Sequence, residues 1–362
     1  MRRKLTLVFL TFLLVSCSHT SADLSSNKLN PYEDVRGIFE LKTLNENQYN
    51  AKDIFTYSFN KNTTFKGNEL YAEQIMENGK NPGLDIKKLH DQNITGEGVN
   101  VAIIDQNMLL DHPEFKDKIV KYYDTGCNTK KDESSMHGPA VTSVLVGDST
   151  GVAPNANVYY VAVPSWKLDS KYYADGIDWI IEQNQSLDKN QKIRVISISG
   201  APSGDGSPFK ENQELYNKAV QRANDEGIMI LDCRSNETTG IIGPAYSSSN
   251  SPDDISSYKA GFPTDEQEIY WDNFIFTPCS YRTLAEEYKE GVHSFQYYGQ
   301  GGLSWGIPYA AGVLALGWQI NPELSNEEII ETLKETSYIN DIGNRIIYPE
   351  AFINSIKNSI NN

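Results

Sequence analysis

Short apolar runs alternate with amphipathic stretches through the middle of the chain. Residues 99–104 are almost continuously apolar and β-branched, which predicts a strand covered on both faces. Three further runs predict strands: 157–163, 193–199 and 228–231. Helical spacing connects Tyr172 to Ile180, and again Leu215, Ala219 and Ala223. The alternation predicts an α/β fold, with a doubly wound, mostly parallel sheet and helices on both faces.

A longer apolar stretch begins at Ser304. It is apolar on nearly all sides as far as Ile320, which predicts a central, buried helix. Pro308 cannot donate an amide to the Ser304 carbonyl, but it lies near the helix start, where proline costs least. A membrane span is the alternative. It is disfavoured because residues 299–302 and Pro308 interrupt the run, which is shorter than the ~20 residues that a span needs.

Four polar residues at the ends of these elements have the side chains of an acyl-transfer site. Asp105 ends the first strand, His137 precedes a glycine, Asn236 follows the last predicted strand, and Ser304 opens the apolar helix. Ligand clefts of such sheets lie at the carboxyl ends of the strands. A serine protease needs a serine nucleophile, a histidine base, an aspartate that orients the histidine, and a donor to the oxyanion. The sequence therefore predicts a serine-protease site.

The chain resembles the subtilases over roughly residues 84–338. The motifs that carry the resemblance are 96–105 with Asp111-His112-Pro113, His137-Gly138 with Gly151-Val152-Ala153-Pro154-Asn155-Ala156, 302–312, and Asn321-Pro322-Glu323-Leu324-Ser325. The order Asp, His, Ser differs from the chymotrypsin and α/β-hydrolase orders. The resemblance implies a subtilisin-like serine endopeptidase that hydrolyses peptide bonds through an acyl-enzyme. Asp105, His137 and Ser304 would form the triad, and Asn236 would donate to the oxyanion.

The motifs also depart from the family pattern. Gln106-Asn107 replaces the usual Thr-Gly after the aspartate, Pro139-Ala140 replaces Thr-His, and Trp305 replaces the usual Met after the serine. None of these changes removes a reacting atom, so we expect them to alter substrate preference and rate. The alternative function is that of a catalytically inactive, subtilase-like surface lipoprotein that binds peptides or a partner.

The resemblance also implies two substrate-binding segments. Ser199-Gly200-Ala201 is similar to the family segment that pairs with substrate as an added strand. Arg234 and Ser235 match positions on the wall of the specificity pocket. Arg234 would then favour an acidic side chain before the cleaved bond, or it points away and pairs with Asp232 or another carboxylate.

The N-terminus predicts export. Basic residues 1–4 precede an apolar run over 5–15, which describes a signal peptide and is too short to span a membrane. The ending Leu14-Val15-Ser16-Cys17 resembles a bacterial lipobox, in which cleavage leaves Cys17 lipid-modified. The alternative is an ordinary secretory signal. We expect the protein on the outer side of the cytoplasmic membrane of a bacterial cell envelope, or secreted.

Three regions follow from these patterns. Residues 1–16 are a lipoprotein signal peptide, 17–83 a tether and N-terminal extension or prosegment, and 84–362 a subtilisin-like peptidase domain.

Loss of residues 1–16 removes three positive charges and changes the net charge from −16 to −19. This charge excludes nucleic acid as a partner, because phosphate binding requires basic patches. The expected partners are a peptide or protein substrate and, through Cys17, the membrane; the oligomeric state is left open.

The cysteines and the search for metal-binding motifs add little to the predicted function. Cys127, Cys233 and Cys279 are odd in number, so at least one is unpaired in a monomer. Cys127 lies ten residues before His137, but Ser304 already fills the nucleophile's role, which favours a structural thiol. The chain has no His-Glu-x-x-His motif and no paired cysteine spacing, so no cofactor and no metal ligand is predicted. Subtilases often hold structural calcium, for which the sequence identifies no ligands here.

Overall fold

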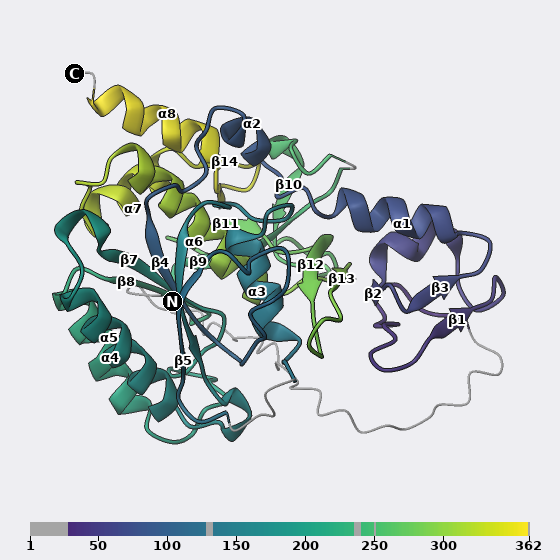
Figure 1. Ribbon diagram of the computed structural model, residues 1–362. Helices are drawn as coiled ribbons and strands as arrows, with labels where there is room; N and C mark the ends of the chain where they lie inside the picture. Colours follow the sequence, from purple (N-terminus) through teal and green to yellow (C-terminus); the bar gives the residue numbers. More distant parts are fainter. Residues whose placement is uncertain (1–27, 128–132, 235–239, 250, 361–362) are drawn as a thin grey trace, which may run out of the picture.

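A five-stranded parallel sheet forms the centre of the computed structural model, which describes residues 28–127, 133–234, 240–249 and 251–360 (Figure 1). In spatial order the strands are β5 (Ile119–Asp124), β6 (Asn157–Ala162), β4 (Asn100–Asp105), β7 (Ile193–Ile198) and β8 (Met229–Asp232). All neighbouring pairs are parallel. The predicted α/β fold is confirmed, and β4, β6, β7 and β8 are the four expected strands. The sequence pattern missed β5, an edge strand that has no fully buried residue.

Strand β4 lies in the middle of the sheet, and all six of its residues are buried. Val101 and Ile103 belong to the core that includes α3 (His137–Val146) and α6 (Leu303–Ile320). Ala102 and Ile104 belong to the core with α4 (Lys171–Gln185) and α5 (Gln213–Asp225), which lie side by side in Figure 1. Because both faces are covered, the strand is apolar throughout and ends at the buried Asp105.

The helices follow the predicted pattern. Helix α6 is buried from Ser304 to Trp318, as its uniform apolarity predicts. In α5 the buried face carries Tyr216, Ala219, Val220 and Ala223, whereas Leu215 is 44% exposed. The residues whose spacing predicted this helix, Leu215, Ala219 and Ala223, all lie within it. Among the described residues, no helix combines the length and apolarity needed to cross a membrane.

A second sheet and two helices complete the C-terminal half. The sheet runs in the order β10 (Tyr258–Ala260), β9 (Ile242–Ser247), β11 (Ile275–Pro278), β15 (Arg345–Ile346) and β14 (Tyr338–Ile339). Helix α7 (Asn326–Glu335) begins at a capping box made by Ser325 and Glu328, and α8 (Pro349–Ile360) packs on α6. These elements enclose α6, whose first turn therefore has fixed surroundings.

Residues 28–83 pack against a hairpin that leads towards Ser304. The segment contains β1 (Lys42–Leu44), β3 (Thr63–Phe65) and α1 (Glu69–Asn78), and α2 (Ile86–His90) follows it. Its strand β2 (Phe59–Asn60) pairs antiparallel with β13 (Ser294–Tyr298), which also pairs with β12 (Arg282–Glu286). In Figure 1 the segment lies beside this hairpin, at the right of the molecule.

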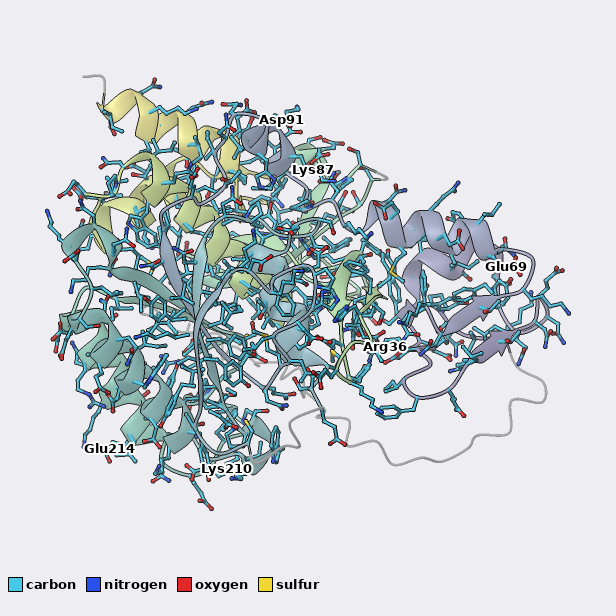
Figure 2. The ribbon with its side chains drawn as sticks, in the orientation of Figure 1. Arg36, Glu69, Lys87, Asp91, Lys210 and Glu214 are labelled. Atoms are coloured by element: carbon cyan, nitrogen blue, oxygen red, sulfur yellow. The ribbon has the colours of Figure 1, made fainter. Side chains whose placement is uncertain are left out.

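Side chains join the N-terminal segment to the hairpin. Tyr297 of β13 completes the small apolar core of the segment and donates its hydroxyl to the Phe55 carbonyl at 2.9 Å. Arg36 donates to Gln296, and its guanidinium lies 4.8 Å above the centre of the Tyr298 ring. In Figure 2, Arg36 lies where the segment meets the rest of the molecule. The segment and the hairpin therefore share a sheet and a core.

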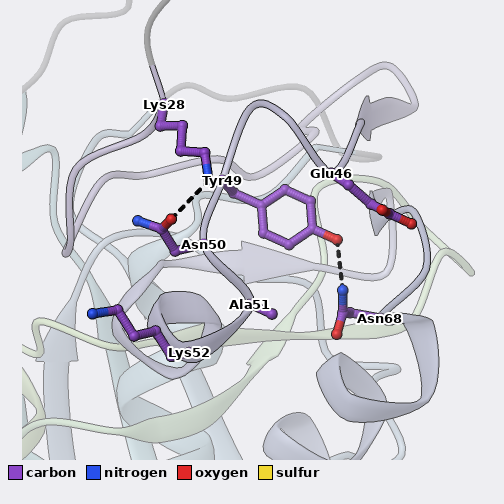
Figure 3. Close-up of a pocket in the computed structure, with 7 residues that line it drawn as sticks. All are labelled: Lys28, Glu46, Tyr49, Asn50, Ala51, Lys52 and Asn68. Atoms are coloured by element: carbon purple, nitrogen blue, oxygen red, sulfur yellow. Dashed lines mark hydrogen bonds between the residues drawn. The ribbon is translucent and has the colours of Figure 1, made fainter.

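A hollow of about 360 Å³ lies within the N-terminal segment (Figure 3). Its lining residues are Lys28, Glu46, Tyr49, Asn50, Ala51, Lys52 and Asn68. Lys28 donates to Asn50 at 2.9 Å, and Asn68 donates to the Tyr49 hydroxyl at 3.0 Å. None of the residues that the sequence predicts for catalysis lines this hollow.

Candidate active site

Asp105 and His137 meet at the carboxyl edge of the parallel sheet. The Nδ1 atom of His137 lies 2.6 Å from Oδ1 of Asp105, a hydrogen-bond distance. The Asp105 side chain is 4% exposed, and its Oδ1 also accepts the Gln106 amide at 2.8 Å. His137 is the first residue of α3, and its side chain is 20% exposed. A buried carboxylate thus holds one ring nitrogen, which leaves Nε2 for other chemistry.

The glycine after His137 allows this close approach. A Cβ atom at Gly138 would lie 2.6 Å from both the Gln106 carbonyl oxygen and the Tyr160 hydroxyl. Tyr160 is fully buried and donates its hydroxyl to the Gln106 carbonyl. Burial raises the pKa of Tyr160 well above its ordinary value, so this hydroxyl stays protonated as a donor. The start of α3 is therefore packed directly against the end of β4.

Ser304 lies in the first turn of α6 and is connected to the end of β7. Pro308 has no amide hydrogen, so the Ser304 carbonyl lacks its usual intrahelical donor. The Ser199 hydroxyl supplies a replacement and donates to that carbonyl at 2.7 Å. In return, the Ser304 hydroxyl donates to the Ser199 carbonyl at 3.4 Å. This pair of contacts fixes the serine at the same sheet edge as Asp105.

Trp305 packs beside the histidine. Its ring centre lies 5.2 Å from that of His137 and 5.5 Å from that of Tyr298. The indole is 3% exposed, and its Nε1 has no hydrogen-bond partner among the described residues. The residue that replaces the family's usual Met therefore forms an aromatic wall between the hairpin and His137, a contact that the motif did not predict.

The predicted substrate-binding segments follow neighbouring strands. Ser199, Gly200 and Ala201 come directly after β7, and the Gly200 carbonyl accepts the Cys233 amide after β8 at 2.9 Å. The Arg234 guanidinium donates from Nε to Asp232 at 2.6 Å. Asp232 is fully buried. Of the two arrangements that the sequence left open for Arg234, the structure has the pairing with Asp232.

Several predicted residues lie outside the described part of the chain. Asn236 and Ser235, predicted for the oxyanion and the pocket wall, fall in 235–239. Cys17 and the signal peptide fall in 1–27. The roles of these residues therefore remain predictions from the sequence.

The thiols are not arranged as nucleophiles. Cys127, Cys233 and Cys279 are all free cysteines. Burial raises the pKa of Cys127 and of Cys279 to about 12, and it raises that of Cys233 well above its ordinary value. A nucleophilic cysteine instead has a lowered pKa. The burial of Cys127 is consistent with the structural role that the sequence favoured.

The other described histidines have different partners. His112 is buried, and its Nε2 lies 3.1 Å from the Ser294 carbonyl oxygen. His90 lies 2.9 Å from the Val152 carbonyl oxygen through Nε2. His293 lies near two carboxylates, Asp111 and Glu287, a cluster that sequence reasoning missed because its members are far apart in the chain.

Comparison with known proteins shows which family the sequence matches. Residues 96–351 match the Subtilase family. The chain is 25% identical over 301 residues to serine protease AprX of Bacillus subtilis, covering 73% of this chain and 64% of AprX. It is 26% identical over 282 residues to subtilisin E of the same species, covering 74% of this chain and 67% of subtilisin E. The chain thus spans about two thirds of the length of these homologous serine proteases.

Solved structures share the fold. The structure of fervidolysin from Fervidobacterium pennivorans, a keratinolytic enzyme related to subtilisin, superposes with a TM-score of 0.55 at 14% identity, covering 75% of this chain and 45% of that one. The prenylagaramide maturation protease PagA also gives 0.55, at 17% identity, covering 75% and 98%. These structures show the fold, and the match over residues 96–351, more than half of the chain, establishes that the chain belongs to the subtilase family.

Proposed function

We propose that this protein is a serine endopeptidase that hydrolyses peptide bonds through an acyl-enzyme formed on Ser304. His137 would accept the proton of the Ser304 hydroxyl as it attacks the carbonyl, and would then donate a proton to the leaving amine. Asp105 would orient His137 and stabilise the imidazolium. Water then releases the acyl group by the same sequence of proton transfers. The reaction uses side chains and backbone amides of the chain itself.

The observation that carries the proposal is the contact between His137 and Asp105. It joins two motifs 32 residues apart at the carboxyl edge of β4, at 2.6 Å. The serine lies in the first turn of a helix, and the first amides of an α-helix have no intrahelical partner. The Ser304 amide is therefore available to an oxyanion, together with Asn236.

The resting position of the Ser304 hydroxyl fits the proposed start of the reaction. It donates to the Ser199 carbonyl at 3.4 Å, which is a long hydrogen bond. A rotation about one side-chain bond releases it. Catalytic hydrogen bonds are often long or poorly aligned until substrate binds.

For the substrate, we propose a peptide that adds as a strand beside Ser199-Gly200-Ala201. The Arg234 guanidinium is already paired with the buried Asp232 and also donates to Ser203 at 2.6 Å. Because its charge is compensated, we expect no strong preference for an acidic side chain before the cleaved bond. A peptide series in which only that residue changes from Glu to Leu should therefore be cleaved at comparable rates.

For the location, we propose export and a lipid anchor on Cys17, with residues 28–83 remaining attached to the peptidase domain at 84–362. The shared core around Tyr297 supports the continued attachment of residues 28–83, because removing this segment would expose the core. Metabolic labelling with a radioactive fatty acid should mark the full chain and not its Cys17→Ser variant.

The experiment that tests the activity is digestion of an unfolded protein substrate, with fragments identified by mass spectrometry. The full chain should produce internal cleavages, and matched Ser304→Ala and His137→Ala variants should produce none. Substrate binding without cleavage by the parent would favour the inactive, peptide-binding alternative.

A further inference from the structure

Three potential metal ligands gather beside the hairpin of β12 and β13, apart from the predicted catalytic residues. Asp111 lies in the loop after β4, Glu287 follows β12, and His293 precedes β13. Nε2 of His293 lies 3.1 Å from Oδ2 of Asp111 and 3.2 Å from Oε1 of Glu287. One potential ligand atom from each residue lies within 4.8 Å of the others.

Glu287 is the unusual member of this cluster. Its side chain is fully buried, and apart from the ion-pair contact of Oε1 with His293, neither carboxylate oxygen has a hydrogen-bond partner among the described residues. Buried charged groups are normally paired and hydrogen-bonded, or they coordinate metals. A divalent cation held between the two carboxylates would offset the cost of this arrangement.

The geometry and the ligand types point to one metal. Zinc binds nitrogen and oxygen ligands at ~2.0–2.1 Å in a tetrahedron, which separates neighbouring ligand atoms by ~3.3 Å. The two separations from the His293 nitrogen, 3.1 and 3.2 Å, are close to this value, and the two carboxylates lie within 4.8 Å of each other. Calcium instead takes six to eight oxygen ligands. We propose that Asp111, Glu287 and His293 bind Zn²⁺, with water in the fourth position.

The site is open enough for a metal to enter. The Asp111 side chain is 43% exposed and that of His293 is 31% exposed, whereas Glu287 forms the buried floor. The Asp111 carboxylate is also positioned by the hairpin, because its Oδ2 accepts the Gly291 amide at 3.2 Å. The ligands therefore converge without a large rearrangement of the hairpin loop.

Bound zinc would fix the hairpin loop against the segment before His137. The Tyr288 carbonyl accepts the Ser134 amide at 3.2 Å, and Glu133 forms a β-bridge with Lys289. The metal would thus connect the loop after β4 to the loop that supports the start of α3. It would stabilise the walls of the site and take no part in the reaction, so the inference is independent of the proposed activity.

Calorimetric titration of the metal-free full chain with zinc tests the proposal. All proteins carry Ser304→Ala, which prevents self-digestion. We expect one zinc ion per chain, with Ca²⁺ and Mg²⁺ binding far more weakly. His293→Ala and the near-isosteric Glu287→Gln should each weaken zinc binding by more than the roughly 10–100-fold that loss of an outer-shell partner costs.

Two control variants separate this site from other zinc-binding groups. Glu290→Gln changes an exposed acid in the same loop and should leave the affinity unchanged, as should His137→Ala at the predicted triad. Hydrogen exchange provides a second measurement, because zinc should slow exchange over 287–293 in the parent and not in His293→Ala. The proposal is overturned if the folded parent binds no zinc, or if His293→Ala and a folded Glu287→Gln bind it as tightly as the parent.

Discussion

The hydrogen bond from Ser199 to the Ser304 carbonyl gives a quantitative test of how the serine is held. Pro308 removes the amide that would normally serve this carbonyl. The Ser199 hydroxyl donates in its place at 2.7 Å, and Ser304 is 5% exposed. Ser199→Ala therefore leaves a buried carbonyl without this donor.

The magnitude follows from the cost of an unsatisfied buried group, about 1–3 kcal/mol. We expect Ser199→Ala to lower the free energy of unfolding by that amount. Pro308→Ala restores an amide four residues after Ser304, so the carbonyl regains an intrahelical donor. In the Pro308→Ala background, Ser199→Ala should cost about 1–2 kcal/mol less than it does with proline present. This difference is the coupling energy of the double-mutant cycle.

Urea unfolding of the four proteins of the cycle measures this coupling. All carry Ser304→Ala, which prevents self-digestion and keeps the backbone carbonyl. Ser207→Ala is the matched control, because its hydroxyl donates to the Ala201 carbonyl at 2.7 Å without involving the helix. It should cost the same in both backgrounds. If Ser199→Ala also costs the same in both, Ser199 does not replace the donor that Pro308 removes, and the reasoning is refuted.

Three further predictions address the oxyanion, the thiols and the N-terminal segment. Asn236→Leu should preserve the unfolding midpoint and lower turnover by about 10²–10³; unchanged peptide hydrolysis would remove Asn236 from the site. In the Cys17→Ser chain at pH 8, a thiol reagent should modify Cys127 and Cys279 more than about a thousandfold more slowly than a free cysteine, since only the thiolate reacts and their pKa is about 12. Rapid labelling of either in the folded protein would contradict their buried environment. Tyr297→Ala should destabilise the chain by about 3–5 kcal/mol and expose residues 28–83 to an added protease, as measured by urea unfolding and limited proteolysis. Unchanged stability and unchanged cleavage would mean that Tyr297 does not hold the segment in place.

The sequence predicted those strands and helices whose own residue pattern reflects how they are buried. The apolar run that forms β4 is covered on both faces, and the uniformly apolar α6 is buried. In both elements the apolar pattern therefore indicates the extent of burial. Edge strand β5 escaped prediction because its exposed positions carry no alternating apolar signal. The spacing of Leu215, Ala219 and Ala223 predicted helix α5, but it did not show that Leu215 would be exposed.

The candidate site could be predicted from the sequence because its residues lie in contiguous motifs. Asp105 ends β4, His137 begins α3 and Ser304 lies in the first turn of α6, and the fold brings these three ends to one sheet edge. Two features were not predictable. The Trp305 ring reaches His137 across elements, and the cluster of Asp111 with His293 joins residues 182 positions apart. Such contacts depend on tertiary packing, which local patterns do not encode.

Labelling with a fluorophosphonate probe, followed by mapping of the modified residue, tests the central claim most directly. The probe reacts with a serine hydroxyl only when a neighbouring base activates it. The full chain should be modified at Ser304, and the Ser304→Ala and His137→Ala variants should not. A folded chain that stays unlabelled while binding peptide, or that labels equally well without His137, would contradict the account of Ser304 as an activated nucleophile.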